Sequence, residues 1–152
     1  MHRDFERDVC IERSFVMSEL RIRFMLRPIT RAKLYKALRV MGRDWLLPRY
    51  RKAWTPLMPT TNYCWCVTEL IYRYLLKRGS GFLPYRVKTG YNSYHYYLMN
   101  PEARLVIDLT ADQFYGDLPD YTKGKRALFY PAISLRTREL AKLLGLKRKR
   151  KC

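Results

Sequence analysis

The amino-acid sequence predicts one α+β domain, in which N-terminal helices precede a central cysteine-bearing helix that packs on a small antiparallel sheet. Three observations lead to this prediction. The chain has 152 residues, which is the size of one domain with one core. Apolar residues recur at helical spacing in the first third of the chain and again over 64–78. Three short segments rich in Tyr, Val, Ile and Leu then follow, and such composition is typical of strands.

Two helices are expected near the N-terminus. Apolar residues recur near helical spacing between charged ones over 3–26, and Pro28 ends this helix. A second helix begins after Thr30, whose side chain can cap it, and ends at Gly42, which can adopt the left-handed conformation. Residues 43–60 hold three prolines and two tryptophans, so we expect an ordered loop packed on the core.

An apolar stripe predicts the central helix over 64–78, and two glycines follow it. The same reasoning predicts a last helix, which Ser134 caps and which extends through Leu144. After this helix comes an exposed basic run.

The strands are expected at 84–89, 93–99 and 104–109. The residues Asn100-Pro101-Glu102 between the last two are typical of a turn, so these two strands form a hairpin.

The charge of the chain is unusual. Its 31 Lys and Arg against 13 Asp and Glu give a net charge of +18, distributed as +8 over 1–60, +1 over 61–124 and +9 over 125–152. We expect chemistry in the near-neutral centre and attraction to an anion in the flanks. The alternative is that the flanks are only a solubilising surface. The expected partner is an acidic protein, a nucleic acid or a substrate bound to nucleic acid, and the expected anion-binding residues of the tail are Lys147, Arg148, Lys149, Arg150 and Lys151.

Several protein classes are disfavoured. No apolar run approaches the ~18–20 residues that span a bilayer, and the N-terminal residues are charged, so we expect a cytoplasmic protein without a membrane partner. The four cysteines, Cys10, Cys64, Cys66 and Cys152, are too few for a disulfide framework, and reduced thiols are expected. The oligomeric state stays open.

Cys64 is the candidate nucleophile, because it lies at the start of the predicted central helix. There the unpaired backbone N–H groups and the positive end of the helix dipole favour a thiolate. The backbone N–H of Cys64 or the side chain of Asn62 can donate to a developing oxyanion. The alternative is that Cys64 is a small core residue.

His95 and Asp108 are the candidate base and acid. The chain has two histidines, and the other is His2. His95 lies in the middle of a predicted strand and Asp108 near the end of its partner, so facing positions place imidazole and carboxylate side by side. The alternative is that His95 is a buried polar group with a structural role.

These residues carry a family resemblance. The runs 64–69 (CWCVTE), 93–98 (SYHYYL) and 106–114 (VIDLTADQF) resemble the core of papain-like thiol enzymes of the transglutaminase, arylamine N-acetyltransferase and NlpC type. More closely, the chain is similar to small phage and bacterial proteins with a Cys-x-x-x-Ser/Thr-Glu helix, an isolated His and an Asp-x-Thr-Ala-x-Gln-Phe segment. Their later Tyr-x-x-Gly and Pro-x-x-Ser segments are matched at 121–124 and 131–134.

The resemblance covers roughly 54–145, and leaves outside it the basic N-terminal segment 1–53 and the tail 146–152. It implies that Cys64 is the nucleophile, His95 the base and Asp108 the orienting acid. It further implies that Gln113 and Thr110 are supporting hydrogen-bonding residues, and that the protein is phage-encoded and interferes with a host process.

Cys66 is a departure from the family pattern. On a helix it points roughly 200° away from Cys64, so we expect it in the core. If the helix began only after Cys66, the two roles would swap.

Together these observations predict a thiol-dependent hydrolase or acyl transferase of the amidase, peptidase, deamidase or transferase type, which needs no cofactor or metal. The second hypothesis is a non-catalytic, basic nucleic-acid-binding protein on a degenerate papain-like fold, with tyrosines that stack on bases. The third is a structural zinc site at Cys64, Cys66 and His95, which the short cysteine spacing and the lack of a clear fourth ligand disfavour.

Overall fold

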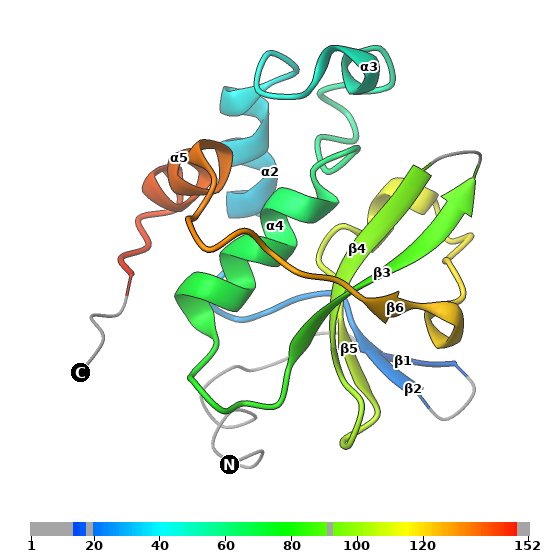
Figure 1. Ribbon diagram of the computed structural model, residues 1–152. Coiled ribbons are helices and arrows are strands. Elements are labelled where there is room, and N and C mark those ends of the chain that lie inside the picture. The colour runs from blue at the N-terminus through cyan, green and yellow to red at the C-terminus, as the bar shows by residue number, and fades with distance from the viewer. Residues whose placement is uncertain (1–13, 18–19, 91–92, 149–152) are drawn as a thin grey trace.

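The computed structural model describes residues 14–17, 20–90 and 93–148. These residues form a mixed α+β fold, with helices gathered on one side of a twisted sheet (Figure 1). In chain order the elements are β1 (Ser14–Met17), β2 (Leu20–Arg23), α2 (Arg31–Met41), α3 (Pro48–Arg51), α4 (Cys64–Leu70), the wider turn η1 (Ile71–Leu75), β3 (Leu83–Gly90), β4 (Ser93–Asn100), β5 (Leu105–Ile107), the short turns η2 (Ala111–Phe114) and η3 (Tyr121–Lys123), β6 (Lys125–Arg126) and α5 (Leu135–Leu143).

The described strands make one sheet in the order β1-β2-β5-β4-β3-β6. The predicted hairpin of β4 and β5 is confirmed, and the side-chain oxygen of Asn100 accepts the N–H of Ala103 in its turn. The expectation of a purely antiparallel sheet is wrong, because β2 lies parallel to β5. This pairing extends the predicted three-stranded sheet with a strand from the N-terminal third of the chain.

The helix predicted over 3–26 is wrong where the structure describes it, since residues 14–17 and 20–23 form the antiparallel pair β1 and β2. Residues 3–13, 18 and 19 lie outside the described residues. In β2 the buried Leu20 and Ile22 alternate with more exposed arginines, which is the period of a strand. Ile22 pairs with Val106 of β5, so a partner distant in sequence decides the conformation of this segment.

The second and last predicted helices are confirmed, together with their caps. The hydroxyl of Thr30 accepts the backbone N–H of Lys33 at the start of α2, and Gly42 ends the helix with a φ of 66°. The hydroxyl of Ser134 accepts the N–H of Thr137 at the start of α5. These side-chain caps satisfy backbone donors that a helix start leaves unpaired.

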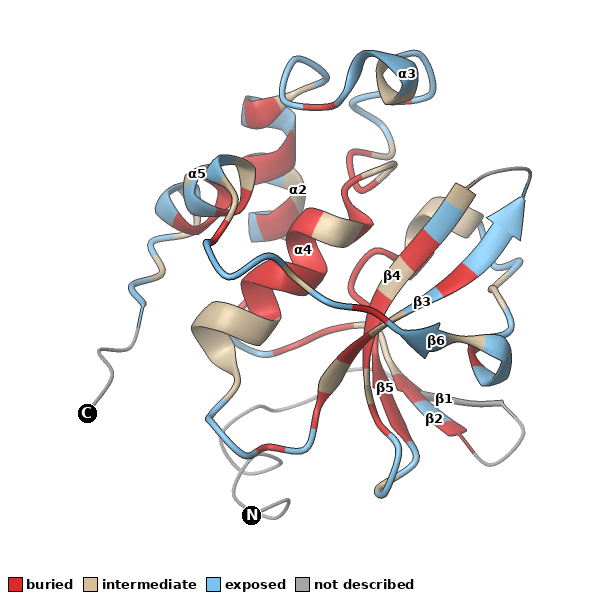
Figure 2. Cartoon of the chain, in the orientation of Figure 1, coloured by how far each residue is buried: buried red, intermediate tan, exposed pale blue. Residues whose placement is uncertain are grey.

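The central helix is confirmed from its predicted first residue, but its regular portion is shorter than 64–78. It runs as α4 to Leu70, widens in η1 and ends at Leu75. Figure 2 shows that α4 is buried along most of its length, between the sheet and the other helices. The loop 43–60 packs on this core as expected through the buried Trp54, although Pro48–Arg51 form one helical turn. No helix among the described residues is long and apolar enough to cross a membrane.

Candidate active site

Cys64 is the first residue of α4, and its side chain faces strand β4. The sulfur lies 4.0 Å from the carbonyl oxygen of Tyr94, and only 9% of the residue is exposed. One turn further along the helix, the hydroxyl of Thr68 donates to the carbonyl oxygen of Tyr96 at 3.1 Å. This bond fixes α4 on β4, so the thiol is held beside the strand that carries His95.

His95 and Asp108 are in direct contact. The Nε2 atom of His95 lies 2.6 Å from Oδ2 of Asp108, and both side chains are buried. Asp108 directly follows β5, whose last residue, Ile107, pairs with Leu98. Contrary to our expectation, the two residues therefore do not occupy facing positions, and the imidazole reaches the carboxylate diagonally across the pair of strands.

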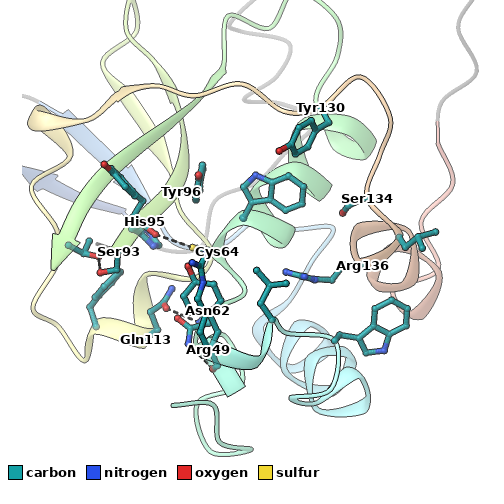
Figure 3. A pocket seen from close by; sticks show the side chains of 18 residues that line it. Arg49, Asn62, Cys64, Ser93, His95, Tyr96, Gln113, Tyr130, Ser134 and Arg136 are labelled. Atoms are coloured by element: carbon teal, nitrogen blue, oxygen red, sulfur yellow. Dashed lines mark hydrogen bonds between the residues drawn. The ribbon is translucent and has the colours of Figure 1, made fainter. Parts of the chain in front are cut away.

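The second ring nitrogen of His95, Nδ1, is also buried, and the described residues offer it no hydrogen bond of regular geometry. The thiol of Cys64 lies close enough to interact with the ring. Figure 3 shows the His95 ring and the sulfur facing one another in the middle of a pocket. The structure thus brings together the three side chains that the sequence singled out.

Asp108 accepts four hydrogen bonds. Oδ2 takes those of His95 and of the Tyr121 hydroxyl, the latter at 2.6 Å. Oδ1 takes the backbone N–H and the hydroxyl of Thr110, at 3.1 and 3.2 Å. A carboxylate offers about four acceptor positions, so this set occupies all of them and fixes the orientation of the carboxylate beside His95.

Two opposing effects act on the pKa of His95. Burial lowers it, because a charged imidazolium loses its hydration. The charge of Asp108 and the hydrogen bond to it outweigh burial, the nearby Cys64 adds to them, and the pKa rises to about 10. The ring is therefore protonated at neutral pH, and an imidazolium beside a thiol favours the thiolate.

Tyr121 is a partner of Asp108 that the sequence reasoning missed. It is fully buried, and burial together with the charge of Asp108 raises its phenol pKa, so the hydroxyl stays a donor. The hydroxyl of Tyr97 donates to the carbonyl oxygen of Tyr121 at 2.9 Å. A Cβ on Gly124 would lie only 1.6 Å from that Tyr97 hydroxyl. The Tyr-x-x-Gly segment therefore supports Asp108. In the sequence, the only signal for this segment was its match to the pattern of the similar proteins.

Cys66 lies in the core, as expected from its place on the helix. It is 1% exposed, and burial raises its pKa to about 12. Its sulfur accepts the hydroxyl of Thr137 on α5, so it faces away from His95. Of the two cysteines, only Cys64 lines the pocket with His95, and the two thiols that a zinc site would need together face different neighbours.

Asn62 and Gln113 lie next to Cys64 in the pocket (Figure 3). The Gln113 side chain accepts the backbone N–H of Asn62 at 3.1 Å and donates to the carbonyl oxygen of Thr110 at 2.9 Å. It thereby holds Asn62 in the left-handed conformation, at a φ of 63°. The Asn62 amide donates one of its two N–H groups to the carbonyl oxygen of Tyr50. Gln113 is therefore a support, and Asn62 keeps a second N–H that can donate to an oxyanion.

Cys64 and His95 line a cleft of about 840 Å³, while Asp108 lies behind the imidazole. Phe114 is the last residue of the Asp-x-Thr-Ala-x-Gln-Phe segment. Its ring makes a T-shaped contact with the His95 ring, with 4.7 Å between the ring centroids. This aromatic contact shields the imidazole from water, and the sequence did not assign it a role.

The expected anion-binding tail is described only up to residue 148. Lys147 and Arg148 are exposed, and Lys149, Arg150 and Lys151 lie outside the described residues. Within the described ranges, no group of three or more His, Cys, Asp and Glu side chains is arranged to hold a metal ion.

Comparison of the chain with protein-family models, with curated proteins and with solved structures gives no match. The chemistry of this site is therefore argued from its own geometry.

Proposed function

We propose that the protein is a thiol-dependent enzyme that hydrolyses an acyl compound or transfers its acyl group, with Cys64, His95 and Asp108 as its catalytic residues. The observation that carries the proposal is the buried pair of His95 and Asp108 at 2.6 Å, with the remaining ring nitrogen unbonded next to the only thiol that lines the cleft in the described chain. The large majority of buried polar side-chain atoms have a hydrogen-bond partner, so an unbonded ring nitrogen beside a thiol is atypical of a purely structural histidine.

In the first half of the reaction, the Cys64 thiolate attacks the carbonyl carbon of an amide, ester or thioester, and the carbonyl oxygen becomes an oxyanion. The second N–H of the Asn62 amide and the backbone N–H groups at the start of α4 are the donors that we assign to that charge. The bond to the leaving group then breaks, and His95 gives its proton to that group. The acyl group is left on the sulfur.

In the second half, water or another acceptor attacks the acyl-sulfur bond. His95, now neutral, takes the proton of the attacking group, and the thiolate leaves. Asp108 orients the ring of His95, and it stabilises the imidazolium each time it forms. Hydrolase and transferase differ only in the acceptor that enters the cleft.

The placement of the site on a helix start and two neighbouring strands supports a papain-like arrangement for the finer fold class. The neutral centre and basic flanks of the chain support an anionic target, such as an acidic protein or a molecule bound to nucleic acid. Both statements belong to the proposal.

The test is the reaction of each cysteine with iodoacetamide near neutral pH, followed by fragment mass spectrometry. Cys64 is expected to react faster than Cys66, because an imidazolium lies beside the first thiol and burial suppresses the second. His95→Ala should reduce the rate at Cys64 to that of an ordinary thiol while the protein keeps its circular dichroism spectrum. Unchanged reactivity in folded His95→Ala would contradict the proposed catalytic role.

A further inference from the structure

Exposed apolar side chains gather at the cleft of Cys64. Ten large apolar side chains are exposed in the described ranges of the chain, and five of these line this one cleft. Tyr130 and Leu135 are the most exposed of the five, at 75% and 73%. Apolar surface that is concentrated in this way indicates a binding site. The five residues are Trp45, Leu47, Tyr94, Tyr130 and Leu135.

The charge of the cleft has one sign. Arg49 and Arg136 line it, and no Asp or Glu does so among the described residues. Arg136 lies in the first turn of α5 and is half-buried, and Figure 3 shows its guanidinium pointing into the pocket. A ligand that fills this cleft therefore needs both apolar and anionic groups.

Strand β4 presents a backbone edge beside the nucleophile. It pairs with β5 only over residues 98–100, so its earlier portion has one neighbouring strand, β3. The carbonyl oxygens of Tyr94 and Tyr96 turn toward α4, where they face Cys64 and Thr68. In an antiparallel pair the N–H of a residue points to the same edge as its carbonyl. The Thr68 hydroxyl occupies this edge at Tyr96, so an extended chain can use it through main-chain groups only at its start, where Ser93 and Tyr94 line the cleft.

We propose that the cleft binds an acidic stretch of polypeptide, in which an aliphatic or aromatic side chain flanks the reacting carbonyl and a carboxylate reaches Arg136. This inference rests on the proposed function. A polypeptide is favoured over a nucleic acid because Cys64 needs an acyl carbon, and a phosphodiester backbone has none. In the reaction the sulfur bonds to the peptide carbonyl carbon, the C–N bond breaks, and the proton of His95 goes to the amine. Water then supplies the hydroxyl that releases the acid.

The wall that carries these groups is held by α4 and η1. The Oε1 atom of the buried Glu69 accepts the backbone N–H of Ser134 at 2.9 Å. Arg73 donates to the carbonyl oxygens of Tyr130 and Pro131. These hydrogen bonds fix the segment that carries Tyr130 and the start of the helix that carries Arg136. Arg136 is therefore a specificity residue that is held in place before a ligand binds.

The test uses peptides of equal length with a vinyl sulfone in place of the reacting carbonyl. One probe carries Leu and Glu, a second Leu and Lys, and a third Ser and Glu. The rate of labelling of Cys64 is measured for each and is divided by the iodoacetamide rate of the same protein. We expect the Leu and Glu probe to label at least about fivefold faster than either other probe at low salt.

Arg136→Gln should bring the labelling rate of Cys64 by the Leu and Glu probe close to the rate by the Leu and Lys probe, so that their ratio is near one. Arg138→Gln is the matched control: it removes the same charge from an exposed position of the same helix that does not line the cleft, and should keep the ratio. If Arg136→Gln does not fold, Arg49→Gln makes the same test at an exposed position. Equal losses in Arg136→Gln and Arg138→Gln would overturn the inference, since only the general field of the protein would then matter.

The outcomes separate this inference from the proposed function. If iodoacetamide labelling of Cys64 depends on His95 but the peptides label at equal rates, the peptide inference is wrong and the enzyme proposal stands. If that labelling does not depend on His95, the proposed function is wrong. If oligothymidylate protects Cys64 at lower concentration than polyglutamate does, the anion that the cleft binds is a nucleic acid, which also overturns the inference.

Discussion

Replacing Asp108 by Asn removes the negative charge that keeps the His95 ring protonated. The pKa of His95 is raised from 6.5 to about 10, against the effect of burial. One pKa unit corresponds to about 1.4 kcal/mol, so the carboxylate stabilises the imidazolium by several kcal/mol. With the charge gone, burial is opposed only by the smaller effect of Cys64, and it favours the neutral ring. The substitution keeps the size of the side chain and its capacity to accept hydrogen bonds from Thr110.

The expected effect on the Cys64 thiol follows from this loss. A thiol without a charged neighbour has a pKa of about 8.5 and is only about 0.3% thiolate at pH 6. Where the imidazolium is present, it favours the thiolate at the same pH. We therefore expect Asp108→Asn to slow alkylation of Cys64 at pH 6 by about two orders of magnitude. The difference should shrink above pH 9, where an unassisted thiol ionises without help.

The assay is the rate of iodoacetamide alkylation of Cys64 between pH 5.5 and 9.5, located by fragment mass spectrometry. Asp112→Asn is the matched control, because Asp112 is a nearby carboxylate that binds Tyr35 and Thr60 instead of His95. It should keep the wild-type profile. Thermal unfolding of each variant shows whether the fold is retained. Wild-type reactivity at pH 6 in folded Asp108→Asn would refute the reasoning, because the carboxylate would then have no influence on the thiol.

Three further predictions concern the packing behind the acid, the pH dependence of stability and the basic tail. Gly124→Ala should cost about 2–4 kcal/mol and lower the melting temperature by roughly 5–15 °C, because the new methyl group overlaps the buried Tyr97 hydroxyl. A folded-state pKa of about 10 exceeds the unfolded value near 6.5, so His95 stabilises the fold fully below pH 6.5 and loses this effect toward pH 10. The difference in unfolding free energy between wild type and His95→Gln should therefore narrow over that range, as urea titrations will show. Truncation after Leu146 should weaken binding to polyanions and reduce its salt slope by several units, at about 0.9 per lost phosphate contact, as titration at several salt concentrations will measure.

The elements that the sequence predicted well are those with local signals at their ends. The caps Thr30 and Ser134 and the turn after Asn100 act within a few residues, so the pattern alone locates them. The first helix failed for the opposite reason. Apolar residues over 14–23 fit helical spacing loosely and strand alternation equally well, and the choice is made by pairing with β5, which lies more than 80 residues later.

The same difference between local and long-range signals applies to the residues of the site. Cys64, His95 and Asp108 could be named because their chemistry restricts the choice, and the chain has few cysteines and histidines. Tyr121 could not be assigned to Asp108, since the chain has 13 tyrosines and the contact joins two irregular segments. By sequence Arg136 belongs to the basic flank, and only the packing of α5 turns it into the cleft.

The network around Asp108 also explains how a protein with a charge of +18 can keep a buried imidazolium. The positive field of the chain opposes further protonation, as burial does. Asp108 counters both through its charge and its hydrogen bond to His95, which together raise the pKa of the imidazole. Tyr121 and two groups of Thr110 hold the carboxylate in place for this contact. His95 therefore holds a proton that it can give to the leaving group and take back from the attacking group, as the proposed reaction requires.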